Sequence, residues 1–293
     1  VERPLIFTID DLLRFPSVSR IHFMECSGNT ATWGGGNPKW TVQDTHGLIS
    51  CSEWTGVSLA TVLQEAGLKP EAKWVLAEGA DAAVMTRSVP IEIALDDAIL
   101  AYAQNGERLR PEQGYPLRLF LPGLEGNMSV KWLRRLKVGD RPFQSREETS
   151  KYTDLMPDGS ARQFTFTMEA KSVITQPSSG HQLRERGFYE IRGLAWSGRG
   201  SITKVEVSAD GGKSWREAEL QQPVLSKCLT RFRLPWAWDG GPALLQSRAT
   251  DSTGYLQPTK HQLISARGLN SNYHFNAVYS WQLGANGAVT HVA

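Results

Sequence analysis

The hydrophobic periodicity of this 293-residue chain changes once, at about Ser172. Before about Tyr152, segments with helical spacing alternate with strand-like runs, whereas short alternating runs such as FYEIRGLAWSG dominate after Ser172. Apolar residues at helical spacing predict amphipathic helices, and alternation with a period of two predicts half-buried strands. The sequence therefore predicts an α+β domain over 1–160 and an all-β sandwich domain over 172–293.

Two helices of the first domain have recognisable ends. Ser58 can cap a helix with one apolar face, and Gly67 supplies its C-terminal stop. A second helix is predicted over 90–106, because Pro90 suits a first turn. The same prediction uses three apolar residues at helical spacing, Leu95, Ile99 and Tyr102. Asn105-Gly106 is the expected exit turn of this helix.

Strand and loop signals cover other parts of the chain. Runs at 117–123 and 130–139 have the alternation of strands. The run ITKVEVSADGGKSWREAEL, residues 202–220, is expected to fold back on Asp210-Gly211-Gly212 as a hairpin. The polar segment at 146–163 is interpreted as a loop that connects the two domains.

Charge and cysteine content exclude several classes of protein. The chain has 32 basic and 30 acidic residues, a net charge of +2, so no overall field would recruit nucleic acid or an anionic membrane. No apolar run reaches the roughly 20 residues that a membrane-spanning helix needs. Cys26, Cys51 and Cys228 cannot all pair within one chain, and no motif indicates zinc. A disulfide scaffold, a zinc protein and a membrane protein are therefore not expected.

Cys26 has two interpretations. A cysteine without nearby metal-binding partners is most often a small, buried residue that packs in the core. However, Cys26 lies in HFMECSGNTATWGGG, where a Ser-Gly-Asn turn after a strand would expose the sulfur to a thiophilic metal. The residue alone does not decide between packing and ligation.

The segment 111–136 carries a second chemical signal. Arg118 and Lys131 lie in apolar, glycine-punctuated chain, where a cation is costly unless it is paired or directed at an anion. Gly114, Gly123 and Gly126 would let the backbone approach a ligand closely. Surface cations at strand ends explain the pattern equally well.

Taken together, several motifs resemble the sulfite oxidase family of molybdenum enzymes, and are most similar to its sulfane dehydrogenase subunits of the SoxC type. These motifs occur in the family's order, and they extend over essentially the whole chain: HFMECSGNT, THGLISCSEWTGVSL, LAEGADAAVMTRSVP, GYPLRLFLPG, SVKWLRRL, EETSKYTDL, AKSVITQP and GLAWSGRGSITKVEVSADGGKSW. The resemblance implies a molybdopterin-binding α+β domain of the sulfite oxidase fold, followed by an immunoglobulin-like β-sandwich dimerisation domain.

The resemblance also implies roles for individual residues. Cys26 matches the cysteine that coordinates molybdenum beside the pyranopterin dithiolene. Tyr152 matches the active-site tyrosine, and Arg231 corresponds more loosely to an arginine of the anion pocket, a role that Arg233 could also take. The matched positions that hold the pterin and its phosphate, with Arg118 also assigned to the catalytic site, are Asp81, Gln113, Arg118, Ser129, Val130 and Lys131.

The chain departs from the family pattern in three places. Thr30 and Ala31 follow Asn29 where the family has two arginines, and Gln113 replaces a histidine. The family's Arg-Asn-His-like segment has no counterpart, and the first residues read as mid-domain sequence. We therefore expect that the N-terminal part of the molybdopterin domain is missing from this chain, which would limit its loading with cofactor.

The implied function is molybdenum-dependent oxidation of sulfur by oxygen-atom transfer. In this reading the substrate is a sulfane sulfur on a carrier protein or free sulfite, and electrons pass to a c-type cytochrome, such as a dihaem subunit. A homodimer or heterotetramer in the periplasm is expected from the family. The alternatives are a free sulfite dehydrogenase and a cofactor-free or truncated relative that acts as a non-catalytic dimeric binding protein.

Overall fold

The computed structural model describes residues 1–30, 36–163, 166–269 and 273–292. Two compact units divide the chain. The first comprises Val1–Met24, Cys51–Thr153 and Gln163–Phe166. The second comprises Glu25–Ser50, Asp154–Arg162 and Thr167–Ala293. The segment that carries Cys26 is therefore part of the second unit.

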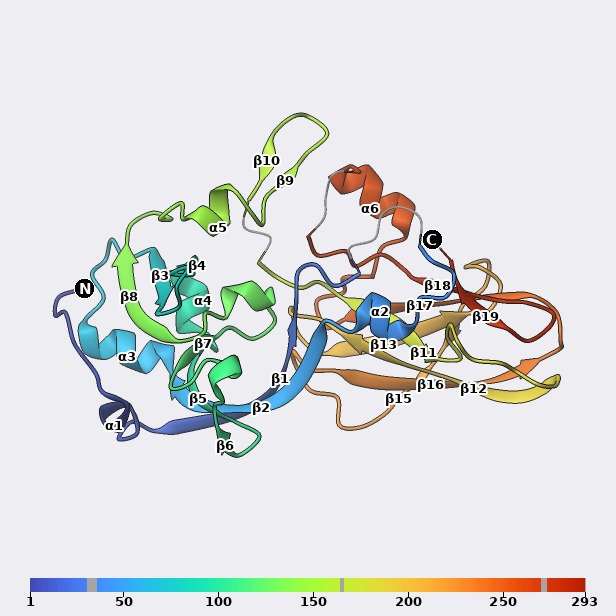
Figure 1. Cartoon of the computed structure of the whole chain (residues 1–293), viewed down its shortest axis with the longest axis horizontal. Helices are drawn as coiled ribbons and strands as arrows, with labels where there is room; N and C mark the ends of the chain where they lie inside the picture. The colour runs from blue at the N-terminus through green and yellow to red at the C-terminus, as the bar shows by residue number, and fades with distance from the viewer. Residues whose placement is uncertain (31–35, 164–165, 270–272, 293) are drawn as a thin grey trace. The chain divides into compact units, whose positions relative to one another are not determined.

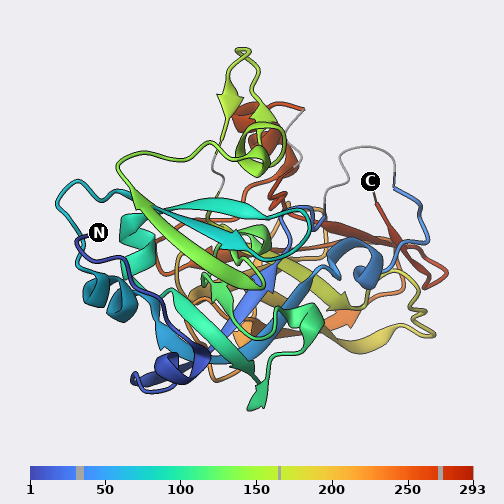
Figure 2. The same cartoon turned by 60° about the vertical axis from the view of Figure 1, so that its left-hand side comes forward.

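Two antiparallel sheets form the framework of the first unit (Figure 1). One sheet has the order β1-β2-β5-β6, with β7 also paired to β5. Its strands are β1 (Ser17–Glu25), β2 (Ile49–Ser58), β5 (Ile99–Gln104), β6 (Glu107–Arg108) and β7 (Arg118–Phe120). The other sheet, β4-β3-β8, contains β3 (Trp74–Gly79), β4 (Thr86–Pro90) and β8 (Leu133–Gly139). Figure 2 shows β8 in yellow-green alongside the cyan strands of this sheet.

Short helices connect these strands. The described helices of the first unit are α1 (Ile9–Leu12), α3 (Leu59–Ala66), α4 (Ile91–Leu95), α5 (Arg146–Thr149) and the 3-10 helices η1 (Pro111–Gln113) and η2 (Gly126–Met128). Helix α3 follows Ser58, as predicted, although the Ser58 side chain makes no capping hydrogen bond. Gly67 ends α3 with φ of 69°, a left-handed value that glycine adopts without steric cost.

The helix predicted over 90–106 is wrong beyond its first turn. Helix α4 ends at Leu95, and Ile99–Gln104 forms strand β5 instead. This strand pairs with β2 on one side and β7 on the other. A central strand buried on both faces has a continuous apolar run, which periodicity alone cannot distinguish from a helix. Asn105-Gly106 does form a turn, with φ of 52° and 78°, between β5 and β6.

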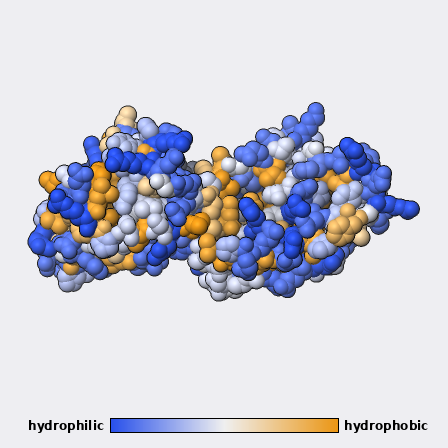
Figure 3. Space-filling model, turned by 90° about the horizontal axis from the view of Figure 1, so that it is seen from below, coloured by the Kyte–Doolittle hydropathy of each residue, from blue (hydrophilic) through white to orange (hydrophobic). Residues whose placement is uncertain are grey.

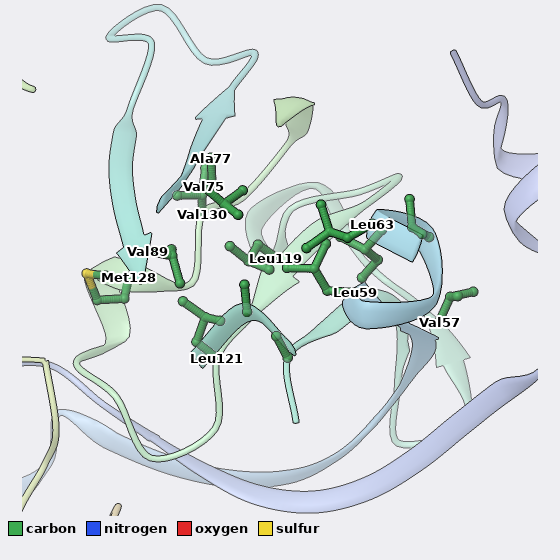
Figure 4. Close-up of a cluster of buried hydrophobic side chains, with 14 of the residues drawn as sticks. Val57, Leu59, Leu63, Val75, Ala77, Val89, Leu119, Leu121, Met128 and Val130 are labelled. Atoms are coloured by element: carbon green, nitrogen blue, oxygen red, sulfur yellow. The ribbon is translucent and has the colours of Figure 1, made fainter. Parts of the chain in front are cut away.

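The core of the first unit lies between its sheets and α3 (Figure 4). Leu59, Leu119 and Val75 are fully buried there, at 0% exposure. The strands predicted in 117–123 and 130–139 are confirmed as β7 and β8. Leu119 on β7 contributes to the core, whereas the preceding residue, Arg118, begins the strand in a polar position described below.

The second unit contains the predicted β-sandwich. One sheet has the order β11-β12-β16-β15 and the other β14-β13-β17-β18-β19 (Figure 1). The strands of the first sheet are β11 (Lys171–Gln176), β12 (Gly187–Trp196), β15 (Glu219–Leu220) and β16 (Thr230–Trp238). Those of the second are β13 (Ile202–Ser208), β14 (Arg216–Glu217), β17 (Ala243–Asp251), β18 (Ser280–Leu283) and β19 (Val289–His291). Trp196 and Trp281 are buried in this unit.

Further elements complete the second unit. They are α2 (Val42–His46), α6 (Lys260–Arg267), β9 (Asp154–Leu155) and β10 (Ala161–Arg162). The hairpin predicted within 202–220 is confirmed, because β13 and β14 are antiparallel, with Glu206 opposite Glu217. The segment at 146–163 is not the plain loop expected from its polarity. It forms the helical turn α5 and the antiparallel pair β9-β10.

The surface is mixed in hydropathy. On the face shown in Figure 3, hydrophilic residues are interspersed with hydrophobic ones. None of the helices in the described ranges is long and apolar enough to cross a membrane.

Candidate active site

Cys26 immediately follows strand β1 and is exposed. Its backbone N–H donates to the carbonyl of Leu48 at 3.0 Å, and its carbonyl accepts from the N–H of Asn29 at 2.9 Å, which closes a turn. A Cβ added at Gly28 would lie 3.8 Å from the Cys26 sulfur, an ordinary contact distance. Because the thiol lies outside the interior, the packing interpretation of Cys26 fails. Ala31 and the glycines at 34 and 35 lie outside the described residues.

The other two cysteines differ from Cys26. Cys51 is half-buried on β2, and Cys228 is buried. Within the described ranges, no group of three or more His, Cys, Asp or Glu side chains could hold a metal ion. A thiol-bound metal at Cys26 would therefore need its other ligands from outside the described side chains.

Arg118 is a buried cation on β7, at 4% exposure. Its Nη1 donates to the Gln113 carbonyl at 2.9 Å, and its Nη2 donates to the Ser129 carbonyl at 2.8 Å. The guanidinium carbon also lies 5.1 Å from the centre of the Trp54 ring. Burial lowers the pKa of Arg118 to about 10.

The charge of Arg118 has no counter-ion among the described residues. Among the described side chains, no carboxylate lies within ion-pair distance of it, and its buried Nε has no hydrogen-bond partner. A buried cation of this kind is costly unless an anion completes the site.

The residues near Arg118 are tied to one another by backbone contacts. The Ser129 hydroxyl accepts from the Leu121 N–H at 3.0 Å, and the Val130 carbonyl accepts from the Leu119 N–H at 2.9 Å. Lys131 Nζ donates to the Glu112 carbonyl at 2.8 Å. These contacts place the Ser-Val-Lys segment beside β7.

Gln113 and Asp81 use their side-chain oxygens locally. The Oε1 of Gln113 accepts from the Arg110 N–H at 2.7 Å, so its amide nitrogen is the atom that could donate to a pterin. The Asp81 carboxylate accepts from the backbone N–H groups of Ala83 and Met85, at 3.2 and 3.1 Å. These contacts fix the orientation of the carboxylate.

Two glycines bring these segments together. A Cβ at Gly79 would lie 2.7 Å from Asp81 Oδ1 and 2.8 Å from the Lys131 carbonyl. A Cβ at Gly114 would lie 2.9 Å from the Lys131 Cβ, and Gly114 has φ of 108°. Only glycine allows such approaches. The first unit therefore brings the predicted pterin-holding residues into one region.

Tyr152 is half-buried in the first unit and has φ of 52°, a left-handed value. Its ring faces the guanidinium of Arg87, with 5.1 Å between the ring centre and Cζ. Arg87 is buried, and its Nη1 donates to the Glu147 carbonyl at 2.9 Å. Arg87 was not among the predicted site residues, although it lies in the matched motif LAEGADAAVMTRSVP.

The structure places Arg231 on the exposed side of β16. Arg233, the alternative, forms an exposed ion pair with Glu219 at 2.8 Å. Neither is buried in a polar cluster, which makes both poor candidates for an anion pocket.

A different cluster in the second unit has the character expected of such a pocket. Glu169 accepts from Arg199 and Arg267, each at 2.7 Å, and from the Tyr255 hydroxyl at 3.1 Å. Burial alone would raise the pKa of Glu169, but His274 and the two arginines hold it well below its usual value. The backbone N–H of His274 donates to the Ser27 carbonyl at 2.7 Å, which ties this cluster to the Cys26 turn.

Arg162 adds a further positive charge to this cluster. It is close enough to Arg267 to lower the pKa of that residue, an effect smaller than that of burial. The Nη1 of Arg162 is buried and has no hydrogen-bond partner. Three guanidinium groups therefore face two carboxylates, Glu169 and Asp154. Sequence motifs gave no signal for Arg162 or Arg267.

These observations fit a group that combines a thiophilic metal with an anionic part. In the second unit Cys26 offers an exposed thiol, the soft ligand that such a metal takes. In the first unit Arg118 offers a buried, uncompensated cation, which suits a phosphate. The chain thus contains residues of the kind that the molybdenum cofactor requires.

Comparison with known families agrees with these features. Residues 1–147 match the family model for the oxidoreductase molybdopterin binding domain. Residues 162–280 match that for the Mo-co oxidoreductase dimerisation domain.

Individual relatives support the same assignment. The mitochondrial sulfite oxidase of Drosophila melanogaster is 31% identical over 91% of this chain and 52% of its own length. That of Mus musculus is 32% identical over 80% of this chain and 45% of its own length. The chain thus spans about half the length of these curated relatives.

A solved structure, the sulfane dehydrogenase SoxCD from Paracoccus pantotrophus, superposes with a TM-score of 0.95. It is 54% identical, over 100% of this chain and 76% of the solved chain. The chain therefore belongs to the sulfite oxidase family of molybdopterin oxidoreductases, with a molybdopterin-binding domain followed by a dimerisation domain.

Proposed function

We propose that this protein oxidises sulfane sulfur bound to a carrier protein and passes the electrons to a c-type cytochrome. The observation that carries this proposal is the 54% identity to sulfane dehydrogenase SoxCD over the whole chain, against 31–32% for the sulfite oxidases. When bound, the molybdenum cofactor supplies a two-electron redox centre and a transferable oxygen atom. The chain's own residues hold that group and place the substrate.

In this proposal Cys26 holds the metal through its exposed sulfur. Arg118 and Lys131 hold the phosphate, because the buried Arg118 has no carboxylate partner in the part of the chain that the structure describes, and Lys131 lies in the same region. Ser129, Val130, Asp81 and Gln113 line the pterin. Their backbone contacts fix them before the cofactor binds, so little ordering remains at that moment.

Tyr152 orients the substrate through its hydroxyl, and Arg87 contacts the ring of Tyr152. The excess positive charge of Arg162, Arg199 and Arg267 around Glu169 attracts the anionic substrate. This cluster takes the role that the sequence suggested for Arg231. A cluster with excess positive charge, tied to the Cys26 turn, is suited to attract an anionic sulfur substrate.

The proposed assembly is a dimer formed through the dimerisation domain, with a cytochrome as a separate subunit. The match of residues 162–280 to the dimerisation domain model supports the first part. The cytochrome is supported by the family resemblance, and such a carrier could empty a two-electron centre in two one-electron steps. A periplasmic location is part of the same proposal and is supported by the family alone.

A cytochrome c reduction assay tests the proposed substrate. Purified, molybdenum-loaded protein is supplied with its cytochrome subunit and, in parallel, with free sulfite or a persulfidated carrier protein. Reduction only with the carrier supports the sulfane dehydrogenase role. Equal or faster reduction with sulfite would support a sulfite dehydrogenase. A protein that takes up no molybdenum when the metal is supplied would instead favour a non-catalytic binding protein.

A further inference from the structure

A buried ion pair lies directly behind the Cys26 turn in the second unit. Lys171 Nζ lies 2.8 Å from Glu25 Oε1, and the two side chains are 1% and 0% exposed. Glu25 is the residue before Cys26, and Lys171 begins strand β11. Burial of two charges is costly unless their hydrogen bonds are complete, so this pair must satisfy its remaining polar atoms.

Glu25 and Lys171 make further hydrogen bonds, and most of these join residues of the Cys26 turn. The other oxygen of Glu25 accepts from Trp196 Nε1 at 2.7 Å, and its Oε1 also accepts from Asn29 Nδ2 at 2.9 Å. Lys171 Nζ donates in addition to the Asn29 carbonyl at 3.1 Å. Lys171 therefore contacts both Glu25, the residue before Cys26, and Asn29, the last residue of the turn. Glu25 also contacts Asn29 directly.

The same network extends to the strand beside the turn. Asn29 Oδ1 accepts from the Leu48 N–H at 3.1 Å, and the Leu48 carbonyl accepts from the Cys26 N–H at 3.0 Å. Among the described residues, the two hydrogen bonds of the Cys26 backbone, to Leu48 and to Asn29, are thus one or two steps from Lys171. The sulfur is exposed, but the backbone that carries it is anchored in the core.

We propose that Lys171, through its pair with Glu25, is a positioning residue that holds the Cys26 turn in the conformation that binds the metal. The proposal rests on the proposed function, in which Cys26 is the metal ligand. Lys171 touches neither metal nor substrate. It holds the backbone that carries the Cys26 ligand, through Glu25 and Asn29. In other metal sites, loss of such outer-shell residues typically lowers metal affinity or activity by about 10- to 100-fold.

The test uses the full chain, prepared with and without molybdenum, and two variants. Lys171→Met removes the bonds to Glu25 and Asn29 and leaves a buried carboxylate unpaired. Trp196→Phe keeps the aromatic packing and removes only the indole hydrogen bond to Glu25. Glu219→Gln, which breaks an exposed ion pair with Arg233 in the same unit, is the matched control. Hydrogen exchange with mass spectrometry and molybdenum content are measured for each.

In the cofactor-free Lys171→Met chain, peptides covering 24–30 and 46–50 should exchange about tenfold faster or more, while peptides from β12 and β16 keep their rates. Molybdenum per chain should fall about tenfold or more. Trp196→Phe should show a smaller rise in the same two peptides, and Glu219→Gln none. Unchanged exchange at 24–30 in both variants would overturn the proposal.

Global unfolding of Lys171→Met and a failure of the unmodified chain to bind molybdenum would have different meanings. If all peptides of Lys171→Met exchange faster, the chain has unfolded, and the milder Trp196→Phe variant decides: faster exchange confined to the two peptides supports the proposal, and wild-type exchange overturns it. If the unmodified chain takes up no molybdenum, the proposed function fails. The exchange comparison needs no metal, so it still decides whether Lys171 orders the Cys26 turn.

Discussion

The guanidinium carbon of Arg87 lies 5.1 Å from the centre of the Tyr152 ring. Arg87 is buried, and its Nε and Nη1 are engaged by Met128 Sδ and the Glu147 carbonyl, each at 2.9 Å. The hydrogen bonds to Met128 and Glu147 therefore fix the guanidinium group, and the Tyr152 ring packs against it. A cation–π contact of this kind contributes about 1–2 kcal/mol when it is removed from water.

We expect Arg87→Met to lower kcat about tenfold, because 1.4 kcal/mol of lost positioning corresponds to one factor of ten. The molybdenum content should stay near that of the unmodified protein, because Arg87 contacts Tyr152 and is not one of the residues assigned to hold the cofactor. Turnover of the loaded enzyme and metal analysis of the same samples measure both. In a Tyr152→Phe background the same substitution should have little further effect on kcat, because the hydroxyl that Arg87 positions is already absent. A normal kcat in Arg87→Met would show that Tyr152 needs no such support.

Arg118→Met should impair cofactor retention. The substitution removes the buried cation and leaves the carbonyls of Gln113 and Ser129 without their donors. Each buried carbonyl left unpaired costs about 1–3 kcal/mol, so the cofactor-free chain should also lose stability. Urea unfolding and molybdenum analysis after gel filtration measure the two effects. Arg20→Gln, at an exposed position on β1, is the control and should change neither. Full cofactor retention in Arg118→Met would contradict the assignment of the phosphate site.

The strands and the sandwich could be read from the sequence, because their alternation is local. Residue types and glycine placement singled out the Cys26 turn and the region of Arg118, but only the resemblance to the sulfite oxidase family favoured ligand roles over packing or surface roles. Local patterns were sufficient wherever a segment's own residues determine its structure.

The failures have a common physical origin in contacts between distant residues. Strand β5 was taken for helix because it is paired along both edges and its first three residues are buried in succession, so it lacks the alternation of a half-buried strand. The bond from Arg267 to Glu169 joins residues 98 positions apart, and that from Lys171 to Glu25 joins residues 146 positions apart. Neither pair has a spacing that a sequence pattern can reveal. Arg231 was assigned to the anion pocket through a loose match to the family's arginine, and the structure leaves it exposed on β16.

The core of the first unit gives a prediction that is independent of the cofactor. Leu119→Ala should lower the free energy of unfolding by about 2–5 kcal/mol, because it leaves a cavity at a fully buried position (Figure 4). Ile6→Ala, at a side chain that is 97% exposed, should change it by no more than about 0.5 kcal/mol. Denaturant unfolding of the two variants in parallel gives the comparison. Similar losses for both would mean that β7 does not pack as described.

Stability should depend on pH through Glu169. Its pKa in the folded protein lies below the ordinary value of about 4.3, so the folded state favours the carboxylate. Its contribution is complete above the ordinary pKa and is lost as the pH falls below it. Glu169→Gln removes this dependence, so its stability should decline less between pH 5 and pH 3 than that of the unmodified chain. Urea unfolding at several pH values measures how the free energy of unfolding changes with pH in each protein. The same pH dependence in Glu169→Gln and in the unmodified chain would exclude the predicted role of Glu169.

The central claim is that the sulfur of Cys26 is bonded to molybdenum, and X-ray absorption at the molybdenum edge tests it most directly. Spectra are compared for the loaded protein, Cys26→Ser and Cys51→Ser, the last being the matched control at a half-buried cysteine. We predict one fewer sulfur neighbour of molybdenum in Cys26→Ser, because an alcohol is a poor substitute for a soft thiolate, and an unchanged shell in Cys51→Ser. An unchanged sulfur count in Cys26→Ser would contradict the account.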